Sequence, residues 1–309
     1  MKTEKIEFIS HDGTHLPAIL WLPEGDCICV LQITHGMTEH IGRYASFARE
    51  MTTHGIAVAG FDLRGHGKNP GSRELAIFAE GDWEASLGDM KCFYDLLHTR
   101  FPGIPHFLHG FSLGSFLLRE YLGRYFDDPA GAIIMGTGYQ PGWLLSIMIG
   151  IVKGQIKKVG YTGASSLVRQ LSFGTYNQNF KPNRTDKDWL CADNNQLDQF
   201  IADPLCRNDF SAGLFYEMLG AMKRTGSSFA YDHWETHIPI LLISGREDPV
   251  GNQGKGVRAV YNRMVKTGIE SVDLHLLPGA RHDVLHEESC GATMQATEII
   301  KNWLLEKTV

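Results

Sequence analysis

The sequence predicts an α/β protein: a mostly parallel central sheet with helices on both faces and one helical insertion. Short apolar segments alternate with segments of helical spacing along most of the chain, which is the pattern of strand–helix–strand units. Residues 138–237 interrupt this alternation with helical stretches. We therefore expect a core of residues 1–137 and 238–309 and an insertion of residues 138–237. A chain of 309 residues is long enough to bury a large core of this kind.

The first part of the core begins with a hairpin and continues with alternating strands and helices. Residues 5–10 alternate in polarity and meet a turn at His11-Asp12-Gly13-Thr14, which is a hairpin signal. Cys27–Thr34 is nearly all apolar, as is typical of a buried strand. The expected strands are Lys5–Ser10, His15–Leu22, Cys27–Thr34, Ile56–Phe61, Ile104–Phe111 and Ala130–Met135, and the expected helices are Tyr44–Thr53, Asp82–Arg100 and Ser115–Leu122.

The insertion and the last part of the core follow. Within the insertion the helical spacing is clearest over Gly142–Val152 and Asp209–Lys223. A helical insertion between two strands of such a sheet is most simply a lid over its active-site end. Beyond it we expect strands at Ile238–Ser244 and Ser271–Leu277 and helices at Gly254–Lys266 and Ser289–Glu306.

Composition excludes several functional classes. A formal net charge of −6 and a pI near 6.1 argue against a nucleic-acid-binding surface. Six cysteines are scattered without C-x-x-C spacing, which fits a reducing compartment. The first residues lack the apolar region of a signal peptide, and no run approaches the roughly 20 apolar residues of a membrane span. We therefore expect a cytoplasmic enzyme.

The pentapeptide Gly110-Phe111-Ser112-Leu113-Gly114 is the most informative motif. It stands between an apolar strand and a helix. A Gly-x-Ser-x-Gly at such a junction is a nucleophile elbow, in which a strained turn lifts the serine hydroxyl out of the sheet. The helix that follows directs its N-terminal backbone donors toward negative charge that develops near the serine. The sequence therefore predicts Ser112 as a nucleophile.

A serine nucleophile needs a base and an acid that orients the base. In the elbow architecture the acid follows the nucleophile along the chain. The strand that ends at Ser244 leads into Gly245-Arg246-Glu247-Asp248-Pro249, so Asp248 is the preferred acid and Glu247 its rival. Without a base after the next strand, Asp248 would more simply be interpreted as a solvent-exposed acid in a loop.

His282 is the predicted base, because it lies in the loop between the final strand and the final helix. His275, inside the strand, and His286, nearer the helix, are its competitors. His35 and His40 invite a check for metal ligands, but their spacing does not place them on one helical face, so no metal is expected.

An oxyanion hole requires two backbone N–H donors, and the loss of one costs roughly 3–4 kcal/mol of transition-state stabilisation. Leu113, the residue after the nucleophile, is expected to provide one donor. The loop after an early strand, His35-Gly36-Met37-Thr38, is expected to provide the other. Gly36 permits a sharp turn, so Met37 is the predicted second donor. The alternative is an ordinary glycine turn into a helix.

The first helix of the insertion is apolar nearly all round and then turns basic at Lys153, Lys157 and Lys158. One interpretation is a helix buried within the insertion. The other is an exposed apolar lip that dips into a lipid interface or lines an acyl pocket. On the second interpretation the substrate-binding residues include Gly36 beside the oxyanion hole and, on the lip, Trp143, Leu144, Ile147 and Met148.

Together these motifs resemble the α/β-hydrolase superfamily, and within it the monoacylglycerol lipase and lysophospholipase branch. The similarity extends over almost the whole chain outside the insertion. The matching segments are His35–His40, Gly42–Tyr44, Phe61–Gly67, Gly110–Gly114, Gly245–Pro249 and Gly279–His282. The resemblance implies a serine hydrolase that needs no cofactor, with Ser112, Asp248 and His282 as the triad and Met37 and Leu113 as oxyanion donors.

Two departures from the family pattern stand out. Met37 and Thr38 occupy positions where a small residue or glycine is common, and Lys68-Asn69 follows Gly67 where a serine is usual. The resemblance implies a lipid-like ester substrate, with a short-chain esterase or an aminopeptidase as alternatives. An aminopeptidase would need a carboxylate in the insertion to hold the substrate amine, and Glu217, Asp203 and Asp209 are available. A non-catalytic binding protein of the same fold is the remote alternative.

Overall fold

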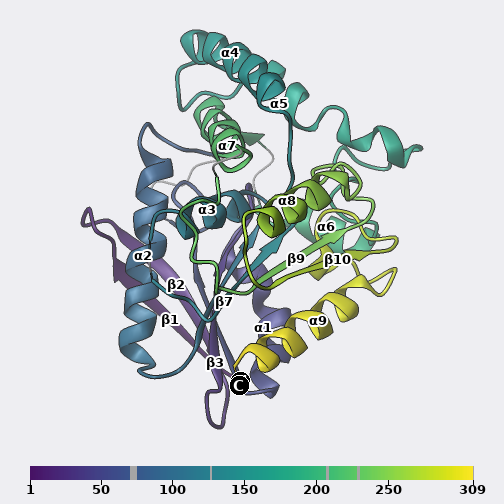
Figure 1. Cartoon of the computed structure of the whole chain (residues 1–309). Coiled ribbons are helices and arrows are strands. Elements are labelled where there is room, and N and C mark those ends of the chain that lie inside the picture. Colours follow the sequence, from purple (N-terminus) through teal and green to yellow (C-terminus); the bar gives the residue numbers. More distant parts are fainter. Residues whose placement is uncertain (70–74, 126, 207–208, 228–229, 309) are drawn as a thin grey trace.

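An eight-stranded open sheet forms the centre of the molecule (Figure 1). The computed structural model describes residues 1–69, 75–125, 127–206, 209–227 and 230–308. Strands β4, β3, β6, β7, β9 and β10 are parallel, whereas β1 and β2 add an antiparallel hairpin at one edge. In spatial order the strands are β1 (Lys2–Ile9), β2 (His15–Leu22), β4 (Ile56–Phe61), β3 (Cys29–Thr34), β6 (His106–Phe111), β7 (Gly131–Met135), β9 (Ile240–Gly245) and β10 (Val272–Leu277).

Helices cover both faces of this sheet, as the sequence predicts. The inner strands are buried on both faces, so their side chains alternate between two cores. Phe107 of β6 packs against Trp303 on one face, and Leu108 belongs to the core on the other. One core contains residues of α1 (Ala45–Thr53) and α9 (Ala292–Lys307), and the other contains residues of α2 (Asp82–Arg100), α3 (Leu113–Leu122) and α8 (Lys255–Lys266).

Helices lie along the chain between β7 and β9, where the sequence predicts an insertion of residues 138–237 (Figure 1). Its helix α4 packs on α7, and α7 packs on α3 of the core. The helix expected over Asp209–Lys223 begins only at Ala212, because Asp209–Phe210 (β8) pairs with Leu75–Ala76 (β5). The insertion comprises α4 (Gly142–Val159), α5 (Ser166–Phe173), a 3-10 helix (Tyr176–Phe180), α6 (Asn194–Ala202), β8 and α7 (Ala212–Thr225).

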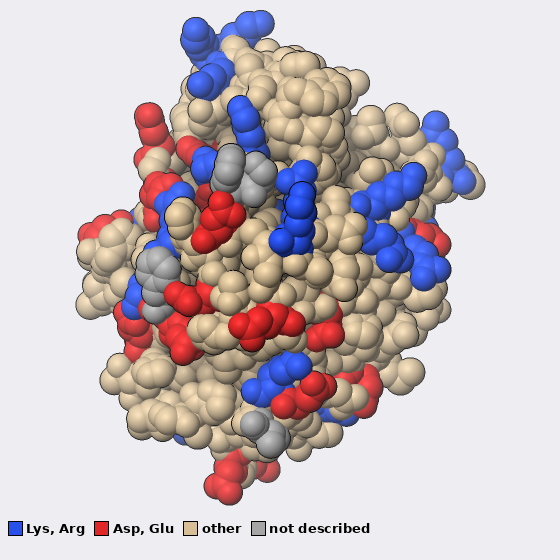
Figure 2. Space-filling model, in the orientation of Figure 1, with Lys and Arg blue, Asp and Glu red and all other residues tan. Residues whose placement is uncertain are grey.

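Charge is mixed over the face seen in Figure 2, where blue side chains stand at the α4 end of the insertion. Lys153, Lys157 and Lys158 of α4 are exposed. Helix α4 runs beyond the expected Val152 because these lysines continue it, and Gly160 at φ 82° follows its last residue. Among the described residues, no helix is both long and apolar enough to cross a membrane.

Candidate active site

Ser112 lies at the sharp turn between β6 and α3, as the elbow motif predicts. Its backbone has φ 50° and ψ −113°, a conformation that a residue other than glycine adopts only under strain. The flanking glycines are required by close packing. A Cβ at Gly110 would lie 2.4 Å from the carbonyl oxygen of Gly114, and one at Gly114 would lie 2.2 Å from that of Thr34. The turn therefore holds the serine out of the sheet at the N-terminus of α3.

The structure brings together the three residues that the sequence predicts as a triad. Ser112 Oγ lies 2.9 Å from Nε2 of His282, and Nδ1 of His282 lies 2.9 Å from Oδ2 of Asp248. Asp248 is fully buried and also accepts hydrogen bonds from the Val250 backbone N–H and the Ser244 hydroxyl. An imidazole in this position can take the serine proton while the carboxylate holds its orientation.

The rival residues are not part of this chain of hydrogen bonds. Glu247 is exposed, and so is His275 on β10. His286 lies in the 3-10 helix Val284–His286, where its Nδ1 lies 2.9 Å from Oδ1 of Asp283 and its Nε2 lies 3.2 Å from the carbonyl oxygen of Arg43. The geometry therefore favours Asp248 and His282.

Two backbone donors stand near Ser112. Leu113 is the first residue of α3, where an N–H has no acceptor within its own helix. The Gly36 N–H donates to Oε1 of Glu39 at 2.7 Å, whereas for the Met37 N–H no acceptor is found in the part of the chain that the structure describes. Thr38 has φ 67°, which lies in the left-handed region that favours glycine.

A buried ionic network supports the Met37 loop, and sequence reasoning did not single it out. Glu39 accepts from the Tyr44 hydroxyl at 3.0 Å and pairs with Arg43, which also pairs with Asp283 at 2.8 Å. Burial alone would raise the pKa of Asp283, but His286 and Arg43 close by hold it well below its ordinary value. The network links the loop that carries Met37 to the residue after His282. The four-residue spacing of Glu39 and Arg43 is a signal that could have suggested their pairing.

The insertion is joined to the His282 loop by several contacts. The Arg281 side chain donates to the carbonyl oxygens of Asp188 and Cys191, and Glu287 accepts from the backbone N–H groups of Ala192 and Asp193. These contacts fix residues 188–193 beside the site. Within that segment the ring of Trp189 lies 5.3 Å from the His282 ring, which has Phe111 at 4.9 Å as another aromatic neighbour.

Ser112 and His282 open into a cavity of about 60 Å³ between the core and the insertion. Met37 and Thr38 line it as well. Most of its wall is apolar or aromatic, with side chains from both parts of the chain. The insertion and α3 supply Phe116, Phe173, Tyr176, Trp189, Met218 and Met222.

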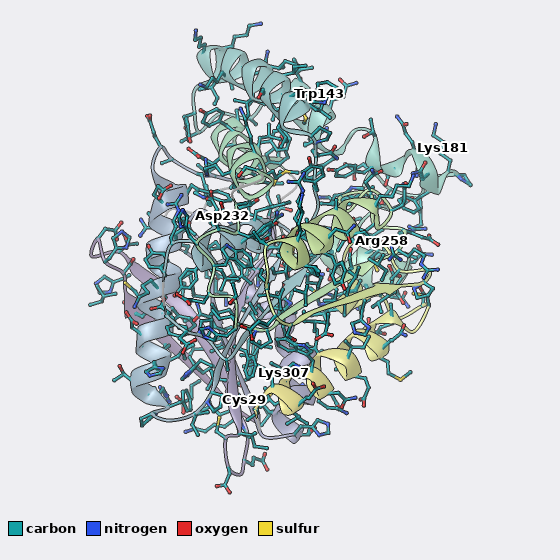
Figure 3. All side chains as sticks on the ribbon, viewed as in Figure 1. Cys29, Trp143, Lys181, Asp232, Arg258 and Lys307 are labelled. Atoms are coloured by element: carbon teal, nitrogen blue, oxygen red, sulfur yellow. The ribbon has the colours of Figure 1, made fainter. Side chains whose placement is uncertain are left out.

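The lip residues expected to bind substrate do not line this cavity. Leu145 and Val152 form the buried side of α4, so that neighbouring positions of the helix face outward. Trp143 is 68% exposed and Ile147 54% exposed, and Figure 3 shows Trp143 at the end of α4. Leu144 is part-buried, and Met148 packs against the core that contains α3. Gly36 lies beside the cavity wall, where an added Cβ would be 3.0 Å from the Phe111 ring.

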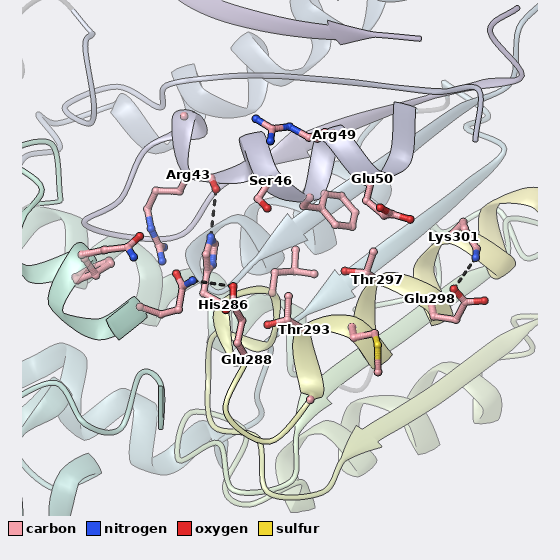
Figure 4. A pocket seen from close by; sticks show the side chains of 18 of the residues that line it. Arg43, Ser46, Arg49, Glu50, His286, Glu288, Thr293, Thr297, Glu298 and Lys301 are labelled. Atoms are coloured by element: carbon pink, nitrogen blue, oxygen red, sulfur yellow. Dashed lines mark hydrogen bonds and ion pairs between the residues drawn. The ribbon is translucent and has the colours of Figure 1, made fainter. Parts of the chain in front are cut away.

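A larger cleft of about 940 Å³ is separated from this cavity by Arg43 and Phe200. These two residues line both the cleft and the cavity. Figure 4 shows Arg43 and His286 in this cleft, with the Glu298–Lys301 ion pair elsewhere in its wall. Its charged lining combines both signs, with Arg49 and Lys301 beside Glu50 and Glu298.

His40, Asp203 and Cys206 stand at the edge of that cleft with their potential ligand atoms within 4.8 Å of one another. The Gly42 N–H donates to Nδ1 of His40, so the ring proton is on Nε2 and points to Asp203 at 2.8 Å. In this tautomer both ring nitrogens of His40 have a hydrogen-bond partner. His35, the other residue considered as a ligand, accepts from the Leu63 N–H and donates to the Gly36 carbonyl oxygen.

The molecule has a mostly parallel open sheet, a serine at a strand–helix turn and an insertion after β7. These features are those of an α/β-hydrolase, and the protein is an enzyme of the hydrolase class. The chain belongs to the family described as serine aminopeptidase, S33, which matches residues 27–289. It is 24% identical over 303 residues to the monoglyceride lipase of Homo sapiens, covering 97% of this chain and 90% of that protein.

Two examples among the solved structures that share the fold are an esterase and a lipase. A thermostable carboxyl esterase from Bacillus coagulans, solved with glycerol, has a TM-score of 0.88 at 23% identity and covers 100% of both chains. A soluble variant of monoglyceride lipase from Saccharomyces cerevisiae, solved with a substrate analogue, has a TM-score of 0.77 at 16% identity. That comparison covers 100% of this chain and 96% of the yeast chain.

Proposed function

We propose that the protein is a serine carboxylic-ester hydrolase that acts through an acyl-enzyme on monoacylglycerol or lysophospholipid-like esters. The single observation that carries this proposal is the hydrogen-bonded series Ser112–His282–Asp248 opening into an apolar cavity. The similarity to monoglyceride lipases over nearly the whole chain supports the substrate class.

The mechanism follows from the groups present. His282 Nε2 takes the Ser112 proton as the hydroxyl attacks the ester carbonyl, and Asp248 stabilises the imidazolium at Nδ1. The N–H groups of Met37 and Leu113 bind the oxyanion. His282 then protonates the departing alcohol, and a water molecule activated by His282 hydrolyses the acyl-enzyme to release the acid and regenerate Ser112.

The cavity suggests how the two halves of the ester are placed. Its apolar region, with Phe116, Met218 and Met222, suits an acyl chain, and its polar region near Thr38 and Glu39 suits the alcohol. A volume of about 60 Å³ is well below the roughly 300–1,000 Å³ of common ligand pockets. A long acyl chain therefore requires the cavity to widen, and the flexible side chains of the two methionines are suited to that.

Residues 138–237 serve as the lid of this site in our proposal, because one side of the cavity is made by the insertion. The exposed apolar side chains of α4 and its lysines would let the lid touch a membrane surface transiently. A cytoplasmic location remains a prediction from the cysteine pattern.

Aminopeptidase activity, which the family description raises, is the second candidate. It would require a carboxylate free to bind the substrate amine. Asp203 and Glu217 are instead bonded to His40 and Tyr161, and neither lines the cavity, nor does Asp209. Glu39 does line it, but its carboxylate is engaged by Arg43 and the Gly36 N–H. These pairings favour ester hydrolysis.

The test is hydrolysis of an acyl series, from acetyl to palmitoyl esters plus 1-monooleoylglycerol, with an aminoacyl amide as the peptidase substrate. We expect turnover of the monooleoylglycerol and no turnover by the folded Ser112→Ala variant. A fluorophosphonate probe should label wild type and not that variant. Turnover by Ser112→Ala at the wild-type rate would overturn the proposal, and so would wild-type activity on the amide alone. A wild-type protein that neither reacts with the probe nor hydrolyses any substrate would indicate a binding protein.

A further inference from the structure

Lys187 is a charged residue in an otherwise mostly apolar cavity. It comes from the insertion, between the 3-10 helix at Tyr176–Phe180 and α6, and lines the same hollow as Ser112 and His282. Its Nζ lies 5.2 Å from the centre of the Phe200 ring. The Arg43 guanidinium carbon lies 4.8 Å from the same ring centre, so one aromatic ring holds two cations beside the cavity.

The two cations differ in their partners. Arg43 forms ion pairs with Glu39 and Asp283. Within the described part of the chain, no carboxylate lies within ion-pair distance of Lys187 Nζ. Within the same part, Nζ forms no hydrogen bond. Burial lowers the pKa of this ammonium, as expected of a cation that is partly removed from water. Among the described residues, Asp186 and Asp209 act on this ammonium only from beyond ion-pair distance, so the cavity presents a cation that no carboxylate pairs with directly.

A neutral glycerol alcohol would leave the Lys187 ammonium without a direct ion-pair partner. The polar lining residues, Thr38, Glu39, Arg43 and Lys187, form the part of the wall suited to the alcohol half of the ester. An ammonium is a compact point charge that binds phosphate, and charge-assisted hydrogen bonds are about twice as strong as neutral ones. An anionic group on the alcohol half would therefore complete the site.

We propose that Lys187 is a specificity-determining residue that binds the phosphate of a substrate whose alcohol half is a glycerophosphate. The inference rests on the proposed ester hydrolysis and narrows its substrate class from monoacylglycerol to anionic lysophospholipid. The phosphate on the alcohol half of the ester, rather than the acyl chain, would then determine which lipid the enzyme selects.

The experiment compares 1-oleoylglycerol with 1-oleoylglycerol 3-phosphate, which differ by one phosphate. Both are presented at the same mole fraction in nonionic detergent micelles, and kcat/KM is measured for each. We expect wild type to prefer the phosphate ester. Lys187→Met should lower the ratio of the two kcat/KM values at least tenfold, mainly through KM for the phosphate ester, whereas Lys187→Arg should retain most of the ratio.

Lys181→Met is the matched control. Lys181 belongs to the same insertion but is exposed at its outer edge, away from the cavity (Figure 3). This variant should leave the ratio of the two kcat/KM values unchanged. If Lys187→Met lowered kcat/KM equally for both esters, the proposed phosphate site would be contradicted. The same holds if Lys181→Met changed the ratio of the two kcat/KM values as much as Lys187→Met does.

A binding measurement separates this inference from the proposed function. In Ser112→Ala, which should not turn over either ester, the Kd for 1-oleoylglycerol 3-phosphate should rise at least tenfold when Lys187→Met is added. Hydrolysis of neither ester by wild type would refute the proposed function, and the binding result would still decide the role of Lys187. An unchanged Kd would overturn the inference even if both esters are hydrolysed.

Discussion

Asp248 and Glu247 are neighbouring acids with opposite surroundings. Asp248 is buried and bonded to His282, Ser244 and the Val250 backbone, whereas Glu247 is exposed on the same loop. Both could be proposed as the triad acid from the sequence. Their surroundings therefore make a comparison within one loop possible.

We predict that Asp248→Asn lowers kcat on a short-chain ester by about 10⁴-fold, because the amide no longer holds the His282 tautomer with Nδ1 protonated. Glu247→Gln should change kcat by less than about twofold. Steady-state kinetics with both variants, after circular dichroism shows that they are folded, tests this. Equal losses in the two variants would remove Asp248 from the mechanism.

At the scale of residues, motif chemistry predicted Ser112, His282, Asp248 and the Met37 loop of the candidate site, but not the part of the site that the insertion contributes. Ser112 could be found because its turn requires glycine at positions 110 and 114. His282 and Asp248 could be found because parallel strands bring their loops to one edge of the sheet. Lys187 and Trp189 could not be found, because they reach the cavity only through tertiary contacts of the insertion.

At the scale of elements, the core follows its local pattern and the insertion does not. Helix α2 runs from Asp82 to Arg100, as the helical spacing predicts, and its buried residues recur at helical spacing along one side. In α4 the apolar residues surround the helix, so the sequence did not indicate which side is buried. The structure buries Leu145 and Val152 and leaves Trp143 and Ile147 facing outward.

We predict that replacing Trp143 and Ile147 together by serine weakens binding to phospholipid vesicles at least tenfold, because each side chain would contribute about 1.5–3 kcal/mol when it enters the bilayer interface. Sedimentation with sucrose-loaded vesicles measures the partition coefficient. The control is Met294→Ser, since Met294 is 76% exposed on α9 of the core. A similar loss in the control, or none in the double variant, would mean that α4 does not dock on membranes.

At the scale of the whole molecule, Arg119 of α3 joins the insertion to the core. This buried side chain donates to Thr137 and Gly138, where the insertion begins, and to Thr225 and Tyr231, near its end. Its helix begins directly after Ser112. The two roots of the insertion and the elbow are therefore held by one helix.

We predict that Arg119→Met lowers the free energy of unfolding by at least about 2 kcal/mol, because it leaves two or more buried carbonyl and hydroxyl groups without a donor at about 1–3 kcal/mol each. The insertion should also unfold before the core, since the contacts that couple them are lost. Chemical denaturation monitored by tryptophan fluorescence and by far-ultraviolet circular dichroism should then give two separate transitions.

Arg124→Met is the control for that prediction. Arg124 follows the same helix, but its side chain is 37% exposed and its nearer partner is the exposed Glu84. The buried Glu120 lies 3.7 Å away and keeps Arg224 as a partner, so the loss of Arg124 should cost less than about 1 kcal/mol. Coincident transitions in Arg119→Met, with a loss no greater than in the control, would show that the insertion is held mainly by the apolar contact between α7 and α3. In that case the insertion would be coupled to the elbow by packing rather than by the buried guanidinium.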